Sequence, residues 1–364
     1  MIDFKEEAKE VSNPPLALYE VQMAEYDKDK LERRGFGWHL KADSQGLPNT
    51  LQEDQITTGI FNIGDQYLLL RPTEFEGGPR YVEITGVGKK RIRQGGNDSP
   101  ATTVVKMQDQ KIPRRVVAAK LAEGTAYFRI LEEARNLAGF NHPNIAKIYD
   151  IALSRRGEGI FGEAGMYIIT EWLDGLTLDD WIETNPPLME IAKTLDDITS
   201  EISYINSKSF VYADLKPDNV VFDSHGVPKL IDLELSEKIN SDGLVKSYQA
   251  GNFNFAPPEQ RHKGELSLRT DVYSFAATVC RLLSGGERFE WTNPIFRFSR
   301  EDHQIEKRIK LSTDVEQYFK KDPEQLNKLK QILAKGLSED PSERQESIEV
   351  INRELQAVFN AILR

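Results

Sequence analysis

Residues 211–234 read Val-Tyr-Ala-Asp-Leu-Lys-Pro-Asp-Asn-Val-Val-Phe-Asp-Ser-His-Gly-Val-Pro-Lys-Leu-Ile-Asp-Leu-Glu. The pattern predicts a loop between short strands that presents Asp214, Lys216 and Asn219. Asp232 follows at the end of an apolar Lys-Leu-Ile run, where a buried strand would deliver it. Carboxylate and amide oxygens bind Mg²⁺, and an ammonium group offsets the charge of a transferring phosphoryl group. These four side chains therefore predict magnesium–nucleotide chemistry.

The composition restricts the class of protein. The chain has 364 residues with 47 Lys+Arg against 58 Asp+Glu, a net charge of −11 that argues against non-specific nucleic-acid binding. One cysteine, Cys280, leaves no internal disulfide framework and no Cys-based metal cluster. No apolar run reaches the roughly 18 residues of a membrane helix, and no secretory signal opens the chain. We expect an acidic, soluble, cytoplasmic protein that binds neither nucleic acid nor membrane.

Strand patterns come first in the chain and helix patterns follow. Short runs rich in β-branched residues predict strands at 81–85, 102–107 and 115–121, and Met166–Glu171 predicts a further buried strand. After Pro187, apolar residues recur three or four positions apart, which is typical of one helix face. The two faces are Ile191, Leu195, Ile198, Ile202 and Ile205, and then Tyr273, Ala276, Val279 and Leu283. A helix over 125–139 and helices in the last forty residues are also expected. This order predicts two unequal lobes with a ligand-binding cleft between them.

The N-terminal residues 1–75 differ in texture from the rest. Ile60-Phe61 and Tyr67-Leu68-Leu69-Leu70 on either side of Gly64-Asp65 predict a hairpin. We interpret 1–75 as an N-terminal extension or accessory subdomain.

Residues 211–234 resemble the catalytic loop and the metal-binding loop of eukaryotic-type Ser/Thr protein kinases. Upstream, Val116-Val-Ala-Ala-Lys120 resembles the strand that bears the nucleotide-binding lysine, and Glu133 resembles the helix glutamate that pairs with it. Met166–Glu171 is similar to the strand that enters the hinge. Downstream, residues 251–260 resemble the end of the activation segment, and residues 271–276 resemble the start of the central helix. Residues 337–344 end at Arg344, which resembles the arginine that pairs with Glu259. Seven such pieces in one order make a specific signal over about residues 78–360.

The resemblance implies an α+β fold of the two-lobed protein kinase type. The N-terminal extension would cover 1–75 and the kinase domain 76–364. Within that domain, a β-rich small lobe would span 76–171 and a helical large lobe 172–364.

The resemblance also implies a role for each matching residue. Asp214 would accept or orient the proton of the substrate hydroxyl, and Lys216 would neutralise the γ-phosphoryl group. Asn219 and Asp232 would ligate Mg²⁺, or Mn²⁺ in its place. The residues expected to bind ATP are Lys120 and Glu133 at the phosphates, Thr170 as gatekeeper, Glu171 and Leu173 at the adenine, and Gly86 and Gly88 in the glycine-rich loop.

The chain departs from the family pattern at several places, among them Pro257 in place of the Ala of Ala-Pro-Glu and Asn252 in place of a supporting threonine. Tyr212-Ala213-Asp214 replaces His-Arg-Asp, so the arginine that would dock an activation-loop phosphate is missing and a non-RD type is implied. Asp232-Leu233-Glu234 replaces Asp-Phe-Gly; Glu234 would contact the metal, compete for Lys120 or point at solvent. The glycine-rich loop carries about a dozen extra residues. The hydroxyls of the activation segment are expected to be unmodified: Ser236, Ser241, Ser247 and Tyr248.

The sequence therefore predicts ATP- and Mg²⁺-dependent transfer of the γ-phosphoryl group to Ser/Thr hydroxyls of protein substrates. The Lys-Pro-Asp-Asn run after Asp214 has the Ser/Thr-kinase form. Two alternatives stay open. One is a pseudokinase that holds nucleotide and regulates a partner through 1–75. The other is a kinase-fold transferase that transfers AMP or phosphorylates a small molecule.

Overall fold

The computed structural model describes residues 17–26, 59–63, 66–72, 79–84, 104–122, 139–153, 166–233, 235–246, 254–262, 264–285 and 305–364. The chain divides into two compact units. The first contains Met1–Arg93, Ala101–Leu131 and Ile148–Trp172, and the second contains Gln94–Pro100, Glu132–Lys147 and Leu173–Arg364.

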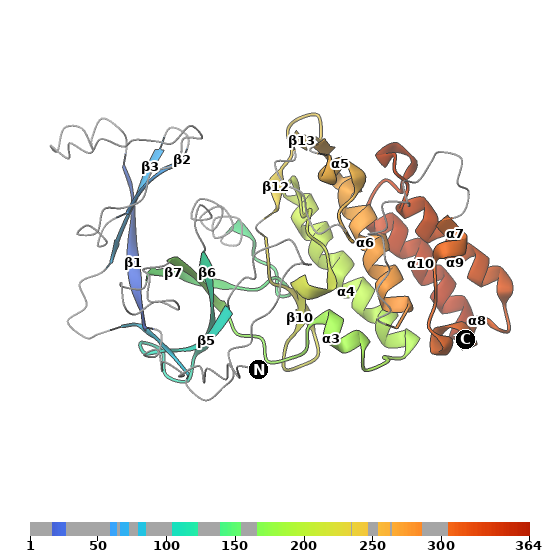
Figure 1. Ribbon diagram of the computed structural model, residues 1–364, viewed down its shortest axis with the longest axis horizontal. Coiled ribbons are helices and arrows are strands. Elements are labelled where there is room, and N and C mark those ends of the chain that lie inside the picture. The colour runs from blue at the N-terminus through green and yellow to red at the C-terminus, as the bar shows by residue number, and fades with distance from the viewer. Residues whose placement is uncertain are drawn as a thin grey trace, which may run out of the picture. The chain divides into compact units, whose positions relative to one another are not determined.

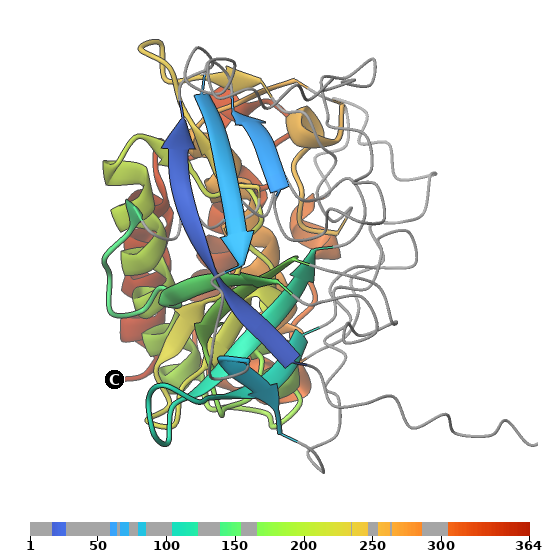
Figure 2. The ribbon, with the colours of Figure 1, turned by 90° about the vertical axis from the view of Figure 1, so that its left-hand side faces the viewer.

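The first unit is built on one antiparallel sheet. Its strands are β1 (Ala17–Tyr26), β2 (Gly59–Ile63), β3 (Gln66–Pro72), β4 (Tyr81–Glu83), β5 (Val104–Asp109), β6 (Val116–Ala122), β7 (Ile148–Leu153) and β8 (Met166–Glu171). They follow the order β2-β3-β1-β4-β5-β6-β8-β7, and β1 also pairs with β7. This extra pairing closes β1, β4, β5, β6, β8 and β7 into a ring, from which β3 and β2 continue beside β1 (Figure 2).

Strand β1 makes the closure because it changes partners along its length. Leu18 pairs with Tyr81 of β4, Tyr19 pairs with Leu153 of β7, and the stretch from Val21 onward pairs with β3. A closed ring leaves its strands without an open edge. Residues that the sequence places in an extension thus contribute three strands, β1, β2 and β3, to this sheet.

The strands expected at 81–85, 102–107, 115–121 and Met166–Glu171 are confirmed as β4, β5, β6 and β8. The hairpin is confirmed as well, since Ile60 pairs with Leu69; its Gly64-Asp65 turn lies outside the described residues. β1 and β7 were not predicted. One face of the sheet carries a buried cluster of residues that alternate along the strands: Tyr81, Val105, Met107, Val117, Ala119, Ala152, Tyr167 and Ile169. Ile151 and Ile168, next to members of this cluster in the chain, are buried as well.

The second unit is mainly helical (Figure 1). Its helices are α3 (Leu178–Ile182), α4 (Leu188–Ser207), α5 (Pro258–Arg261), α6 (Leu268–Leu283), α7 (Ile305–Arg308), α8 (Thr313–Phe319), α9 (Pro323–Gly336) and α10 (Ile348–Ile362), with 3₁₀ turns η2 (Pro217–Asn219) and η3 (Pro341–Glu343). Three short antiparallel pairs accompany them: β9 (Phe210–Val211) with β12 (Glu237–Lys238), β10 (Val220–Phe222) with β11 (Pro228–Leu230), and β13 (Val245–Lys246) with β14 (Glu265–Leu266).

The core of the second unit lies among α4, α6, α9 and α10, which pack against one another (Figure 1). Both predicted helix faces are confirmed, because every one of their residues is buried. Helix α6 is buried almost all round and begins with a capping box between Ser267 and Thr270. Cys280 is part of this core, as expected. The expected helix over 125–139 lies outside the described residues except at its end.

None of the helices in the described ranges combines the length and the apolar composition that a membrane crossing requires.

Candidate active site

The β10–β11 hairpin brings Asn219 and Asp232 to the same end of one small element. The turn η2 ends at Asn219 and leads directly into β10, where Val220 pairs with Leu230 of β11. The N–H of Ile231 then donates to the carbonyl of Asn219 at 3.1 Å. Asp232 directly follows Ile231 in the chain. Asn219 and Asp232 therefore lie at the same end of the hairpin, on either side of this hydrogen bond.

Asp214 is held by two side-chain donors that meet on one of its oxygens. Lys216 Nζ lies 2.7 Å from Asp214 Oδ2, and Asn219 Nδ2 donates to the same oxygen at 2.6 Å. The Asn219 amide also donates to the Asp214 carbonyl at 2.9 Å. Lys216 and Asn219 are both buried. The carboxylate is thereby fixed in orientation, and both of these side-chain donors use Oδ2.

The charges of this cluster act strongly on one another. Burial raises the pKa of the Asp214 carboxyl, and the Asp232 carboxylate raises it further, against the opposing effects of Lys216 and Asn219. Burial lowers the pKa of the Lys216 ammonium, but the Asp214 and Asp232 carboxylates reverse that shift and raise it. Lys216 therefore stays cationic, and the two buried carboxylates favour a further cation nearby.

The donor set fits a magnesium ion that is shared with phosphate oxygens. Within the described ranges, no group of three or more His, Cys, Asp or Glu side chains is arranged to hold a metal ion. Mg²⁺ at nucleotide sites needs only one or two carboxylates, because phosphates and waters complete its octahedron. The Asp232 carboxylate and the Asn219 amide are hard oxygen ligands of this kind. Glu234 lies outside the described residues.

The peptide groups before Asp214 are bound by Asp271, in the first turn of α6. Its carboxylate accepts from the N–H of Tyr212 at 3.0 Å and from the N–H of Ala213 at 2.9 Å. Asn206 Nδ2 donates to it at 2.9 Å. Burial raises the pKa of Asp271 to about 6, although these hydrogen bonds oppose the shift. The sequence indicated 271 only as a helix start; an acid at the head of an otherwise apolar helix was the available signal.

Asp218, on the same turn as Asn219, belongs to a second charged group. Arg281 of α6 donates from Nε and Nη2 to Asp179 Oδ1 of α3, at 3.1 and 2.9 Å. Burial and the Asp179 carboxylate raise the pKa of Asp218, while Lys216 and Arg281 act to lower it. Sequence reasoning did not identify this group, because its members are far apart in the chain.

The ion pair expected between Glu259 and Arg344 is confirmed. Arg344 Nη1 and Nη2 lie 2.7 and 2.9 Å from the two carboxylate oxygens of Glu259. Thr270 also donates to Glu259, at 3.1 Å. The pair fixes α5 to η3 in the interior of the helical unit.

The remaining predicted site residues are divided between the two units or lie outside the described residues. Lys120 lies on β6, opposite Val104 of β5 and Ile168 of β8. Thr170 and Glu171 end β8, and all three belong to the first unit, whereas Asp214 and Leu173 belong to the second. Three more lie outside the described residues: Glu133, Gly86 and Gly88. The assembly of these residues into one site stays a prediction.

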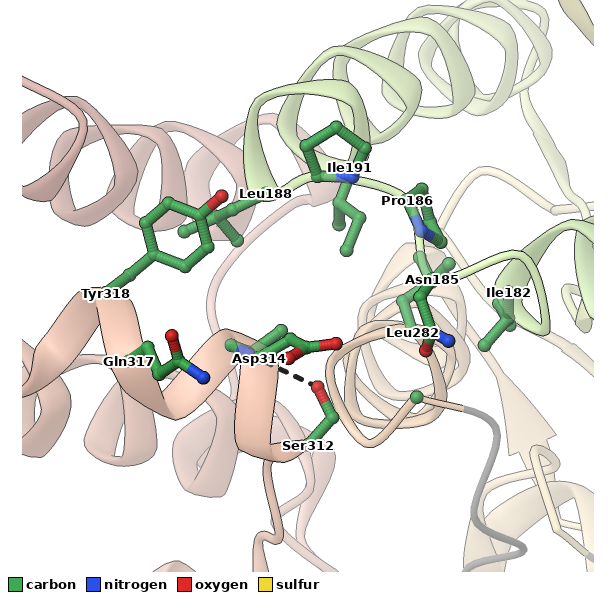
Figure 3. Close-up of a pocket in the computed structure, with 13 residues that line it drawn as sticks. Ile182, Asn185, Pro186, Leu188, Ile191, Leu282, Ser312, Asp314, Gln317 and Tyr318 are labelled. Atoms are coloured by element: carbon green, nitrogen blue, oxygen red, sulfur yellow. Dashed lines mark hydrogen bonds between the residues drawn. The ribbon is translucent and has the colours of Figure 1, made fainter.

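A cavity of about 490 Å³ in the second unit is lined by other residues (Figure 3). Its walls come from α3, from the loop before α4, from α4, from the end of α6 and from α8; Tyr318 lies beside Leu188 on one side of it, and Ile182 lies on the other. None of the residues of the Asp214 cluster belongs to this lining. The hollow is therefore distinct from the candidate active site.

Comparison with known proteins gives consistent similarities. The model of the protein kinase domain family matches residues 93–355. The serine/threonine-protein kinase PrkC of Bacillus subtilis is 23% identical over 257 residues, which are 70% of this chain and 37% of the relative. The probable serine/threonine-protein kinase PknB of Lactococcus lactis is 29% identical over 210 residues, 55% of this chain and 32% of the relative. PknB of Mycobacterium tuberculosis (strain H37Rv) is 27% identical over 197 residues, 52% and 31%. The chain spans about a third of the length of these curated relatives.

Proposed function

The chain belongs to the protein kinase family, and from that premise we propose that it transfers the γ-phosphoryl group of ATP to Ser/Thr hydroxyls of protein substrates. The observation that carries the proposal is the buried cluster in which Lys216 and Asn219 both bind Asp214 Oδ2. Phosphoryl transfer depends mainly on positioning and on charge compensation, and this cluster supplies both.

Asp214 acts on the acceptor hydroxyl. Because both side-chain donors bind Oδ2, the other oxygen, Oδ1, is the atom that orients the hydroxyl and accepts its proton. The raised pKa of Asp214 makes the carboxylate a better proton acceptor than an exposed aspartate. Lys216, kept cationic by its two carboxylate neighbours, offsets negative charge that develops on the transferred group.

The cofactor assignment rests on the donor types and on the family. Bound ATP with Mg²⁺ supplies the phosphoryl group and neutralises its charge. Asp232 and Asn219 would hold the ion, Mg²⁺ or Mn²⁺. The residues proposed to bind the nucleotide itself are Lys120, Glu133, Thr170, Glu171, Leu173, Gly86 and Gly88.

The proposal also covers the kinase subtype, the domain bounds, a regulatory partner and the location in the cell. Ala213 before Asp214 gives a kinase of the non-RD type, which needs no phosphate docked beside Asp214. We also propose that 76–364 is the kinase domain, that 1–75 binds a regulatory partner, and that the chain acts in the cytoplasm.

The test offers [γ-³²P]ATP or [α-³²P]ATP, with Mg²⁺ and a generic protein acceptor, to the wild type and to Asp214→Asn. We expect γ label on Ser and Thr of the acceptor, and its loss in the variant. Asp242→Asn, which changes an exposed aspartate of the same unit, is the control and should keep full transfer.

Other results would contradict the proposal. Transfer of α label would indicate an AMP transferase, and γ label on a small molecule alone would indicate a different acceptor class. Thermal stabilisation by Mg²⁺-ATP without any transfer would indicate a pseudokinase.

A further inference from the structure

Ala213, directly before Asp214, has an unusual backbone conformation. Its φ is 60°, in the left-handed region that costs a residue with a Cβ about 1 kcal/mol. Asp271 accepts hydrogen bonds from the N–H groups of Tyr212 and Ala213. These bonds alone do not fix the peptide planes, because a peptide can still rotate when its carbonyl oxygen has no hydrogen bond. What holds the two carbonyls therefore decides how firmly Asp214 is positioned.

Both carbonyls are held by neutral side chains. Ser236 Oγ donates to the carbonyl of Tyr212 at 3.2 Å, and Gln260 Nε2 donates to the carbonyl of Ala213 at 2.7 Å. Ser236 is 4% exposed and Gln260 is 1% exposed, so water does not replace these bonds easily.

The two donors come from opposite ends of one chain segment. Ser236 lies four residues after Asp232, in a turn where its N–H donates to the carbonyl of Leu233 at 3.1 Å. Gln260 lies in α5, next to Glu259, which Arg344 anchors. The segment between Asp232 and α5 thus begins and ends with a side chain bonded to the peptides before Asp214.

We propose that Ser236 and Gln260 are positioning residues, which hold the Tyr212 and Ala213 carbonyls and thereby set Asp214 for transfer. This inference rests on the proposed function and names a regulation of that site. Because both bonds are neutral, docking of the two segment ends sets the rate, and neither charge nor phosphate is needed. Ser236 is then a structural hydroxyl, since a phosphate on it would break the bond to Tyr212.

Each variant removes the donor of one of the two carbonyl hydrogen bonds with little change of shape. Ser236→Ala deletes only the hydroxyl, and Ser236→Thr restores one. Gln260→Met keeps the length of the side chain but has no donor. Matched controls at exposed positions of the same unit are Ser241→Ala and Gln317→Met.

Kinetics on the full chain test the proposal. We expect kcat for γ transfer to fall roughly tenfold in Ser236→Ala and in Gln260→Met, which corresponds to one net hydrogen bond. KM for ATP should stay within twofold, and Ser236→Thr should recover most of the rate. Unchanged kcat in both variants, or equal losses in Ser236→Ala and Ser236→Thr, would overturn the proposal.

Amide hydrogen exchange separates this inference from the proposed function. Residues 210–215 should exchange faster in Ser236→Ala and Gln260→Met than in the wild type and the controls. If the wild type transfers no γ label, the proposed function fails, and exchange then decides alone. Faster exchange would support the positioning role, and unchanged exchange would overturn it.

Discussion

Glu201 of α4 is a carboxylic acid placed in the interior of the helical unit. Its side chain is 0% exposed. Burial raises its pKa well above the usual range, and the Asp197 carboxylate raises it further. Asn144 and Lys229 oppose the shift without cancelling it. A negative charge on Glu201 also raises the pKa of Tyr212, two residues before Asp214. Ionisation of Glu201 therefore acts on a residue beside the active site.

Glu201→Gln should stabilise the protein, and more so at higher pH. As the pH rises, the Glu201 carboxyl loses its proton in the unfolded chain at a lower pH than in the folded chain, because folding raises its pKa. Rising pH therefore favours unfolding between the two pKa values. We expect a gain that grows from about pH 5 to about 1–3 kcal/mol near pH 8, measured by urea unfolding. The exposed Glu190→Gln on α4 is the control; a gain independent of pH would contradict the explanation.

Lys216→Met should move the acid side of the pH–rate profile to higher pH. Burial raises the pKa of Asp214, and Lys216 opposes that shift by its charge and its hydrogen bond. Without the ammonium, Asp214 stays protonated to higher pH, and kcat should also fall about a hundredfold. The measurement is kcat for γ transfer across the pH range.

Lys216→Arg keeps the positive charge and is the matched variant. Its acid limb should stay near that of the wild type. If the acid limbs of the pH–rate profiles of Lys216→Met and Lys216→Arg coincide, the charge of Lys216 does not set the pKa of Asp214.

Among the elements, α5 is anchored by the buried ion pair of its Glu259 with Arg344. Arg344 is buried against Glu259 and also donates to the carbonyls of Ser338 and Arg269 at 2.8 and 3.0 Å. Arg344→Met should cost about 3–5 kcal/mol of unfolding free energy, because it leaves a buried carboxylate without its cation. Chemical denaturation measures the loss.

Glu259→Gln combined with Arg344→Met tests that reason. Removing the charge left behind should return part of the lost stability. A double variant less stable than Arg344→Met alone would show that packing, and not the buried charge, causes the loss.

The sequence predicts an element well when its pattern is local. The apolar spacing of α4 and the β-branched runs of β5 and β6 follow directly from helix and strand periodicity. β1 was missed because it has no comparable run and is stabilised by pairing with β3, β4 and β7, which no local pattern encodes.

The candidate site shows the same division. Asp214, Lys216 and Asn219 lie within six residues of one another, so their proximity follows from the sequence, whereas the hydrogen bonds that join them follow from the structure. Asp271 and Gln260 reach the loop from 58 and 47 positions away, and nothing near Ala213 indicates either. Such long-range hydrogen bonds follow only from the folded chain.

At the scale of the whole molecule, the ring in the first unit depends on residues before the family match. Removal of 1–75 deletes β1, β2 and β3 and leaves open edges on β4 and β7. We expect this truncated chain to unfold at a lower temperature and to aggregate, measured by thermal unfolding with light scattering. Removal of 1–16, which ends before β1, should change neither measurement.

An unchanged unfolding temperature after removal of 1–75 would show that β1 adds nothing to the stability of the sheet. The same pair of truncations, assayed for γ transfer, also tests whether the N-terminal residues influence the rate.

The short closure by β1 has a mechanical consequence. In the described register, Tyr19 and Glu20 join this strand to β7, and Ala17 and Leu18 join it to β4. A force applied to the chain on the N-terminal side of Ala17, by a tether or a bound protein, would act first on the pairings of these four residues. The strain then passes through β4 and β5 to the strand that carries Lys120.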